Sequence, residues 1–292
     1  MSEPRVTLIG AAGMLGRAWC ELLDGAGIAY APMDRAEIDI ADPATLDRID
    51  PGTTHLINCA AYTAVDKAEQ EEGLATAING HAVAHLARRA AAIDAVLVNY
   101  STDYVFNGTA TSPYPIDQPH DPLNAYGRSK AVGEVALEAS EASWLNVRTS
   151  WLYAPWGNNF VLTMAKLTAD KPTLRVVDDQ RGRPTSARHL AETTLRLIDA
   201  TERGNAQPGH HHVTDGGACT WCGFTRAIND ALGHACDVQP CTTADFPRPA
   251  KRPAYSVLDL SATQAALGPM PDWTVNLRSV LDRMTGSVGS TG

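Results

Sequence analysis

A glycine-rich turn close to the N-terminus constrains the fold of this chain more than any other feature. The turn runs Gly10-Ala-Ala-Gly13-Met-Leu-Gly16; it directly follows the apolar run Arg5–Ile9 and opens Met14–Leu23, a stretch with helical spacing. In such a strand-to-helix turn, backbone N–H groups approach a pyrophosphate at the positive end of the helix. A tight turn without a ligand would use the same glycines, but the context favours a dinucleotide site.

Further apolar runs of strand length alternate with helical segments along the first half of the chain. The runs are His55–Cys59, Val96–Ser101 and Trp144–Thr149, and the alanine-rich stretch Ala75–Ala92 has helical periodicity. Strands that alternate with helices predict crossover units and a parallel sheet covered on both faces. We therefore expect an α/β fold in which residues 1–150 form a Rossmann-type doubly wound parallel sheet that binds NAD(P).

The composition changes after Trp151, where prolines and glycines become frequent and helical patches become shorter. This change predicts a smaller C-terminal region, residues 151–292, that mainly binds the substrate. One more helix is expected at Ala187–Ala200, and part of residues 185–215 is expected to pack back on the first sheet. The glycine- and serine-rich tail Gly286–Gly292 is expected to be frayed.

Composition and charge narrow the possible functions. Apolar residues make up 44% of the chain and charged residues 20%, an ordinary globular balance. The net charge of −9 argues against a general nucleic-acid binder, although a local glycine turn can still bind a nucleotide. No run of 18 apolar residues is present, and the N-terminal segment lacks the charged start and cleavage region of a signal peptide. We expect a cytoplasmic protein with neither nucleic acid nor membrane as a partner.

The cysteines allow two interpretations. Four of them and a histidine run could be assembled into a zinc site, but their spacing matches no common zinc module. Disulfides are equally unsupported in a cytoplasmic chain, so we expect reduced thiols, with Cys20 and Cys59 as small core residues. The residues of the hypothetical zinc site are Cys219, Cys222, Cys236, Cys241, His210, His211 and His212.

Residues expected to contact the cofactor come from four segments. Near the end of the second strand, Asp34 could accept hydrogen bonds from ribose hydroxyls, whereas Arg35 could pair with a 2′-phosphate. Asp34 therefore favours NADH and Arg35 favours NADPH, so the choice between the two cofactors stays open. The expected contacts are Gly10, Ala12, Gly13, Met14, Leu15 and Gly16 in the turn, Asp34 and Arg35, then Asp39 and Ile40 beside the adenine, and Ala60, Ala61, Tyr62 and Thr63 after the next strand.

A tyrosine and a lysine four residues apart carry the expected chemistry. Tyr126 and Lys130 share one face of a helix in the segment Asn124–Glu134. A free phenol has a pKa of about 10, and a nearby cation lowers that value, so the pair is a candidate general acid with its own tuning group. Lys130 can also hold the ribose of the cofactor, which fixes the nicotinamide beside Tyr126. Thr102, at the end of a predicted strand, could bind the same carbonyl oxygen as the phenol.

Several motifs occur in order along nearly the whole chain and together carry a family resemblance. The chain resembles the dTDP-4-dehydrorhamnose reductase family, which are extended short-chain dehydrogenases. The GxxGxxG spacing of the turn also favours the short-chain dehydrogenase version of the cofactor site. The further motifs are AAYTAVDKAE (Ala60–Glu69), STDYVFNG (Ser101–Gly108), PLNAYGRSK (Pro122–Lys130), RTSWLYAPWGNNF (Arg148–Phe160), DDQRGRPT (Asp178–Thr185), PAKRPAYSVLD (Pro249–Asp259) and PDW (Pro271–Trp273).

The resemblance implies the last step of dTDP-L-rhamnose synthesis. A hydride from NADH or NADPH would go to C4 of dTDP-4-dehydro-L-rhamnose, and Tyr126 would protonate the new alkoxide. Thr102 would hydrogen-bond the keto oxygen and Lys130 would support Tyr126. Thr102, Asp103 and Trp151 would contact the sugar nucleotide, while Asn159 and Arg252 would contact its diphosphate. For Trp151, plain core packing is the competing interpretation.

One departure from the family concerns a metal. Members described as magnesium-bridged dimers carry glutamates just after the third glycine and after the Gly-x-Pro-Thr motif. This chain has Ala18 and Arg188 at those positions. A hard cation needs oxygen ligands, so magnesium is not expected, and a monomer and a homodimer are both open.

Two alternatives to this function remain open at this point. One is a reductase or epimerase that acts on another nucleotide-linked ketosugar. The other is a non-catalytic regulatory subunit built on the same fold, since a fold alone does not define a function. The intact set of Thr102, Tyr126 and Lys130 favours catalysis, because a regulatory protein has no need of a tuned phenol.

Overall fold

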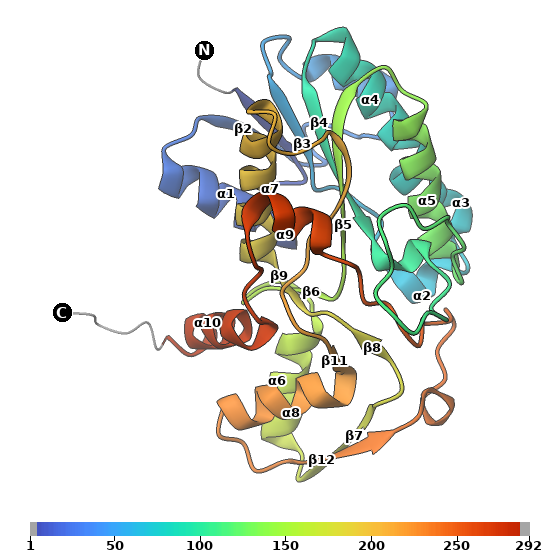
Figure 1. Cartoon of the computed structure of the whole chain (residues 1–292), viewed down its shortest axis with the longest axis vertical. Helices are drawn as coiled ribbons and strands as arrows, with labels where there is room; N and C mark the ends of the chain where they lie inside the picture. The colour runs from blue at the N-terminus through green and yellow to red at the C-terminus, as the bar shows by residue number, and fades with distance from the viewer. Residues whose placement is uncertain (1–4, 287–292) are drawn as a thin grey trace, which may run out of the picture.

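A six-stranded parallel sheet forms the centre of the larger part of the protein (Figure 1). The computed structural model describes residues 5–286. The strand order is β10-β5-β4-β3-β1-β2, and all neighbouring strands are parallel. The predicted Rossmann-type doubly wound sheet is confirmed. Its strands are β1 (Val6–Ile9), β2 (Tyr30–Met33), β3 (His55–Asn58), β4 (Val96–Thr102), β5 (Ser143–Thr149) and β10 (Gly209–His212).

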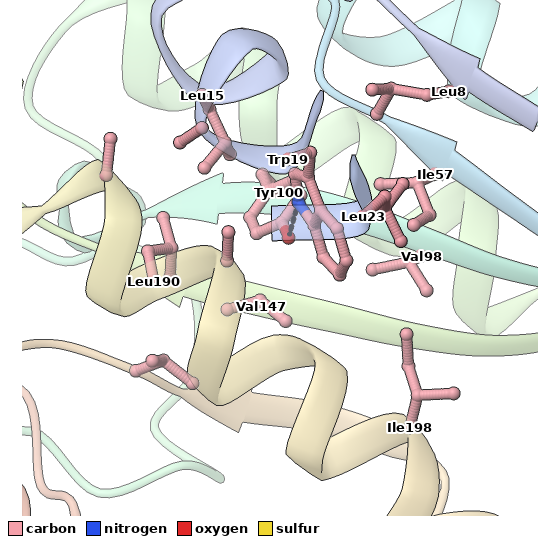
Figure 2. Close-up of a cluster of buried hydrophobic side chains, with 14 of the residues drawn as sticks. Leu8, Leu15, Trp19, Leu23, Ile57, Val98, Tyr100, Val147, Leu190 and Ile198 are labelled. Carbon is pink, nitrogen blue, oxygen red and sulfur yellow. Dashed lines mark hydrogen bonds between the residues drawn. The ribbon is translucent and has the colours of Figure 1, made fainter. Parts of the chain in front are cut away.

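Helices cover both faces of this sheet. On one face, α1 (Met14–Ala26) and α7 (Ala187–Glu202) bury an apolar cluster that includes Leu15, Leu23 and Leu190. Within the cluster, Trp19 Nε1 donates a hydrogen bond to Tyr100 Oη at 2.8 Å (Figure 2). On the other face, α4 (Ala82–Ala92) and α5 (Ala125–Glu138) pack together with η1 (Pro43–Arg48).

Residues beyond 185 complete the sheet. The helix expected at Ala187–Ala200 is α7, which packs against α1, and β10 pairs with the edge of β5. The helix α9 (Ser261–Leu267) packs in turn on α7 and β10. The parallel sheet is therefore built from five strands within residues 6–149 and a sixth strand at residues 209–212.

A row of buried amides crosses the middle of the sheet. Asn58 Nδ2 donates to Asn99 Oδ1 at 2.9 Å, and Asn99 Nδ2 donates to Asn146 Oδ1 at 2.8 Å. Asn146 Nδ2 then lies 3.0 Å from His210 Nδ1. These four residues are register partners on β3, β4, β5 and β10. Because a slip by one residue would leave buried polar groups unpaired, the row specifies the register of four strands.

The helix predicted over Ala75–Ala92 contains an interruption. It consists of α3 (Glu72–Thr76), a π-helical segment η2 (Ala77–His81) and α4. The α5 helix packs closely on η2 at Gly133. A Cβ at this position would come within 2.3 Å of the carbonyl oxygen of Asn79, so only glycine allows the close approach. A single π turn inside an α-helix is frequent at functional sites.

The smaller region lies below the sheet in the view of Figure 1. Its core is a separate apolar cluster that includes Tyr153, Phe224 and Trp273. Three two-stranded ladders accompany its helices, and the ladders β6–β9 and β8–β11 lie between the six-stranded sheet and helices α6 and α8 (Figure 1). Its elements are β6 (Leu152–Tyr153), α6 (Phe160–Asp170), β7 (Thr173–Val177), β8 (Arg181–Gly182), β9 (Thr185–Ser186), β11 (Cys219–Thr220), α8 (Trp221–Ala231), β12 (Asp237–Cys241), η4 (Thr243–Asp245) and α10 (Trp273–Thr285).

Candidate active site

The glycine turn has the geometry of a pyrophosphate cradle. Gly10 has φ of 75°, and a Cβ there would come within 2.8 Å of the backbone nitrogen of Ala60. A Cβ on Gly16 would come within 2.0 Å of the Gly10 carbonyl oxygen. Gly13 is the N-cap of α1 and supplies no side-chain cap, so the first N–H groups of the helix stay available to a ligand. Among the expected contacts in this turn, Ala12 and Gly13 are exposed and Leu15 is buried.

Asp34 follows β2 and lies against the glycine turn. Its Oδ1 accepts a hydrogen bond from the backbone nitrogen of Ala12 at 2.9 Å. Arg35 is exposed and points to no described partner. The carboxylate is therefore held beside the turn, while the Arg35 guanidinium is exposed to solvent.

Of the two residues expected beside the adenine, Asp39 is partly exposed to a ligand and Ile40 is buried. Asp39 Oδ1 accepts a hydrogen bond from the backbone nitrogen of Ala41 at 3.0 Å, which closes a local turn. Ile40 is 6% exposed and packs in the core below α4. Asp39 is half-buried, so the edge of this turn, rather than the Ile40 side chain, is what the structure presents to solvent.

The loop after β3 meets the glycine turn and is held by a residue that sequence reasoning missed. Ala60 lies beside Gly10, and Ala61, Tyr62 and Thr63 continue away from it. The amide of Asn79 accepts from the Tyr62 nitrogen and donates to the Tyr62 carbonyl, both at 2.9 Å, and it also donates to Ser129 Oγ at 2.9 Å. Asn79 lies in the π-helical segment, so it fixes this loop to the helix of Tyr126 and Lys130. In the sequence, Asn79 is a polar residue next to a glycine within an alanine-rich helix, and this pattern could have indicated its structural role.

The start of α5 places Tyr126 beside the end of β4. Asn124 caps the helix by accepting from the Gly127 nitrogen at 2.8 Å. Gly127 allows a close approach, because a Cβ there would come within 2.1 Å of the Tyr104 carbonyl oxygen. The Tyr126 phenol lies near the side chain of Thr102, the last residue of β4. The structure therefore brings the expected phenol and hydroxyl together.

The phenol is not tuned in the expected way. Burial raises the pKa of Tyr126, the nearby Asp103 carboxylate raises it further, and the hydrogen bond to Thr102 lowers it. The expectation that Lys130 lowers this pKa is wrong for this structure, because the lysine points elsewhere. Its Nζ donates to the Tyr100 carbonyl oxygen at 2.9 Å.

Lys130 is itself strongly affected by its surroundings. The residue is 6% exposed, and burial lowers the pKa of its ammonium to about 8, against a partly offsetting effect of Glu134. Glu134 follows one turn later and is fully buried, where it accepts from Arg148 Nη2 at 2.6 Å and bonds His120 Nε2 at 2.8 Å. This buried ion pair was not predicted from the sequence. Glu134 lies four residues after Lys130, so the helical spacing of the two residues could have indicated that they are close.

Asp103 lies directly next to the Thr102 hydroxyl. Thr102 Oγ1 donates to Asp103 Oδ1 at 3.0 Å, and Asp103 is 2% exposed. Burial raises the pKa of this carboxyl from 3.8 to about 7, which the hydrogen bonds to it only partly offset. A titratable group with a strongly shifted pKa beside a phenol is typical of a reaction centre.

Two residues expected to bind the diphosphate have other partners. Asn159 caps α6 through its Oδ1, and its Nδ2 donates to the carbonyl oxygens of Ala154 at 2.9 Å and Trp156 at 3.0 Å. Both amide hydrogens are therefore occupied, and the geometry does not support its assignment to the diphosphate. Arg252 forms an ion pair with Asp66 on α2 (Val65–Ala68) and donates to the Ala250 carbonyl at 2.7 Å.

The structure does not fit the zinc hypothesis or the magnesium of the metal-bridged members. Within residues 5–286, no group of three or more histidine, cysteine, aspartate or glutamate side chains could hold a metal ion, and all six cysteines are free thiols. The histidine run forms β10. Ala18 is buried, and Arg188 pairs with Glu192 at 2.8 Å, which leaves a cation where a metal would need an oxygen ligand.

The fold and the site together define a class. A glycine turn with an open helix N-terminus and a threonine, tyrosine and lysine at the carboxyl edge of a parallel sheet are characteristic of Rossmann-type short-chain dehydrogenases. The chain belongs to the RmlD substrate binding domain family, whose model matches residues 4–286. The resemblance inferred from the motifs is thereby confirmed.

Relatives of known name agree with this assignment. The chain is 42% identical to a dTDP-4-dehydrorhamnose reductase of Streptomyces griseus, over 98% of this chain and 96% of the relative. A solved dTDP-4-dehydrorhamnose reductase from Clostridium acetobutylicum is similar with a TM-score of 0.91 and 37% identity, over 96% of this chain and 99% of that one. The dTDP-4-dehydrorhamnose reductase of Bacillus anthracis, solved in complex with NADP, gives a TM-score of 0.91 at 33% identity over the same shares.

No helix within residues 5–286 is long and apolar enough to span a membrane.

Proposed function

We propose that the chain reduces the C4 ketone of dTDP-4-dehydro-L-rhamnose to dTDP-L-rhamnose with NADH or NADPH. Full-length relatives at 42% and 37% identity carry the name dTDP-4-dehydrorhamnose reductase, and a solved relative holds NADP. The observation that carries the proposal is the placement of the Tyr126 phenol near Thr102 and Asp103 at the carboxyl edge of the sheet. Ligands of open α/β sheets bind at this edge, and the glycine turn opens onto it.

Each residue of the site has a definite task in this reaction. A bound nicotinamide supplies the hydride. The raised pKa of Tyr126 keeps its phenol protonated at neutral pH, which is the state required of a proton donor to the C4 alkoxide. Thr102 Oγ1 donates to Asp103 Oδ1 in this structure and would turn its O–H to the keto oxygen of a bound ketosugar, which places that oxygen beside the phenol. Asp103 and Trp151 contact the sugar nucleotide.

Lys130 has two tasks. One of its N–H groups donates to the Tyr100 carbonyl, and the others are available to the ribose hydroxyls of the cofactor. With a pKa of about 8, most of the Lys130 side chains carry a charge at pH 7. The charged Lys130 ammonium, bound to the Tyr100 carbonyl oxygen, also holds α5, and with it Tyr126, against β4.

The conservative variant Tyr126→Phe tests the proposal. Only the phenolic O–H is removed, so turnover should fall by about 10²-fold or more, while cofactor affinity should stay nearly unchanged. NADPH oxidation would be followed with a panel of dTDP-linked ketosugars, which also separates this reaction from one on a different nucleotide sugar. Tyr30→Phe, on the edge strand β2, is the matched control. Turnover of Tyr126→Phe within a factor of about three of the wild type would remove the phenol from the mechanism.

We further propose a cytoplasmic location. A monomer and a homodimer both remain compatible with the proposed function.

A further inference from the structure

A ladder of stacked aromatic rings extends from the end of β5 into the smaller region. The indoles of Trp151 and Trp221 are stacked, with ring centroids 3.4 Å apart and planes at 9°. Trp221 in turn contacts Phe160 at 4.5 Å, and Phe160 stacks on Phe224 at 5.6 Å. One end of this ladder is therefore anchored in the core of the smaller region, and the other end is Trp151.

The backbone of Trp151 adopts a conformation that its side chain disfavours. Its φ is 47°, in the left-handed region, and only one other non-glycine residue within residues 5–286, Asp94, has a positive φ. Such a conformation persists only where the surroundings enforce it, and it clusters at functional sites. Gly182 leaves room for the indole, because a Cβ there would come within 2.5 Å of the Trp151 ring. The Trp151 indole is therefore held between Gly182 and Trp221.

Trp221 is fixed more firmly than its half-buried position requires. It is the first residue of α8, whose N-cap Thr220 accepts from the Gly223 nitrogen at 3.0 Å. Its indole Nε1 donates to Gln180 Oε1 at 3.1 Å, and Gln180 Nε2 donates to Thr243 Oγ1 at 2.9 Å. Cys219, two residues before Trp221, pairs with Gly182 between strands β11 and β8. This pairing links the two residues that contact the Trp151 indole.

Trp151 also lies close to the reaction centre along the chain. Thr102 and Thr149 are register partners at the ends of β4 and β5, and Trp151 follows two residues after Thr149. Trp221 covers one face of the Trp151 indole, and Gly182 lies close to its Cε2, Cζ2 and Nε1 atoms. The Trp151 Nε1 is an N–H donor without a hydrogen-bond partner within residues 5–286.

We propose that Trp221 is a positioning residue for the sugar nucleotide, which holds the Trp151 indole in place so that its N–H donates to the substrate. This inference rests on the proposed function, which places the sugar at Trp151. The other residues of the site lie at the carboxyl edge of the sheet. Trp221, on α8 of the smaller region, would therefore add a contribution from the smaller region. Gln180 and Gly182 support the same arrangement.

Three variants and one control test the inference. Trp221→Ala should raise the KM for the ketosugar nucleotide about tenfold, the size expected for losing one stacked aromatic pair, and should leave the KM for NADPH unchanged. Trp221→Phe, which keeps a stacking ring, should restore most of the affinity. Trp151→Phe removes the indole N–H and should also raise the KM for the sugar nucleotide. Trp144→Phe, at the far end of β5, should change neither constant.

A spectroscopic readout is independent of activity. Two indoles stacked at the observed separation couple their electronic transitions, so the near-ultraviolet circular dichroism should contain a band from the Trp151–Trp221 pair. Trp221→Phe and Trp151→Phe should both abolish this band, and Trp144→Phe should retain it. A near-ultraviolet spectrum unaffected by Trp221→Phe would overturn the inferred stack even if Trp221→Ala fails to fold.

The outcomes separate the inference from the function on which it rests. If Trp151→Phe leaves the KM for the sugar nucleotide unchanged, the substrate does not lie at Trp151, and the proposed placement fails. If Trp151→Phe raises that KM but Trp221→Ala does not, the placement holds and the positioning role of Trp221 is overturned.

Discussion

Lys130 lies one turn after Tyr126 on α5, yet its ammonium donates to the Tyr100 carbonyl on β4 rather than approaching the phenol. The lysine is thus bound to Tyr100, two residues before the end of β4, and the phenol lies near Thr102 at that end. Helical spacing brings the two side chains to one face of α5, but their contacts give them separate positions along β4. The two residues can therefore be tested separately.

Removal of the ammonium should affect both binding and rate. Lys130→Met retains much of the buried aliphatic chain but removes the donors to the Tyr100 carbonyl and to a ribose. We expect the Kd for NADPH to rise about tenfold and turnover to fall further, measured by calorimetry and by steady-state assay. Lys166→Met, on the exposed surface of α6, is the matched control. An unchanged Kd in Lys130→Met would show that the lysine does not anchor the ribose.

The buried Asp103 carboxyl should make stability depend on pH. Its pKa is raised from 3.8 in an unfolded chain to about 7 in the folded protein. Between these values the folded state binds more protons, so stability should fall as the pH rises through this window and level off above about 7. Asp103→Asn lacks this effect, so its Tm should exceed that of the wild type by an amount that grows from pH 4 to pH 7. The limiting slope is about 1.4 kcal/mol per pH unit.

The control for this titration is an exposed aspartate. Asp94→Asn lies in a turn with φ of 55°, a conformation that asparagine also tolerates. Its Tm, measured over the same pH range, is the reference for loss of an exposed carboxylate. A pH-independent difference for Asp103→Asn would show that Asp103 ionises normally in the folded state.

Chelation should leave the protein unchanged. Arg188 and Ala18 stand where the metal-bridged members carry glutamates, and the Arg188 guanidinium is paired with Glu192. We therefore expect EDTA to alter neither activity nor the hydrodynamic size measured by size-exclusion chromatography. Loss of activity that magnesium restores would show that other carboxylates bind a metal.

The choice of cofactor should be nearly balanced. Asp34 is held beside the glycine turn by the Ala12 nitrogen, where it would repel a 2′-phosphate, whereas the exposed Arg35 could pair with that phosphate. We expect both cofactors to be used, with NADPH preferred by no more than about tenfold, equivalent to about 1.4 kcal/mol. Arg35→Ala should weaken NADPH alone in kcat/KM measurements. Equal losses for both cofactors would mean that Arg35 has a structural role.

Sequence patterns predicted the elements with strong periodicity and missed those set by tertiary contacts. The glycine turn, the strands at Val96 and Trp144 and the helix at Ala187 followed from local spacing. The π-helical segment did not, because the one-residue shift that places Asn79 is not visible in an alanine-rich repeat.

Candidate site residues were predictable by type but not by orientation. An arginine and an asparagine suit phosphate, but the sequence could not show that Asp66 pairs with Arg252 or that Asn159 caps a helix. The direction of the pKa shift of Tyr126 likewise depended on where Lys130 points. Each of these outcomes is decided by a partner distant in the sequence or by a local backbone turn.

The row of amides through Asn58, Asn99, Asn146 and His210 links the order of synthesis to the completion of the sheet. When residues 1–150 have left the ribosome, Asn146 has its partner on β4 but lacks the one on β10. Its second polar bond forms only after the chain has built part of the smaller region and returned with residues 209–212. The sheet is therefore complete only when residues 209–212 are present, and a fragment cut after β5 ends in an uncovered strand edge on which the Asn146 Nδ2 lacks its partner.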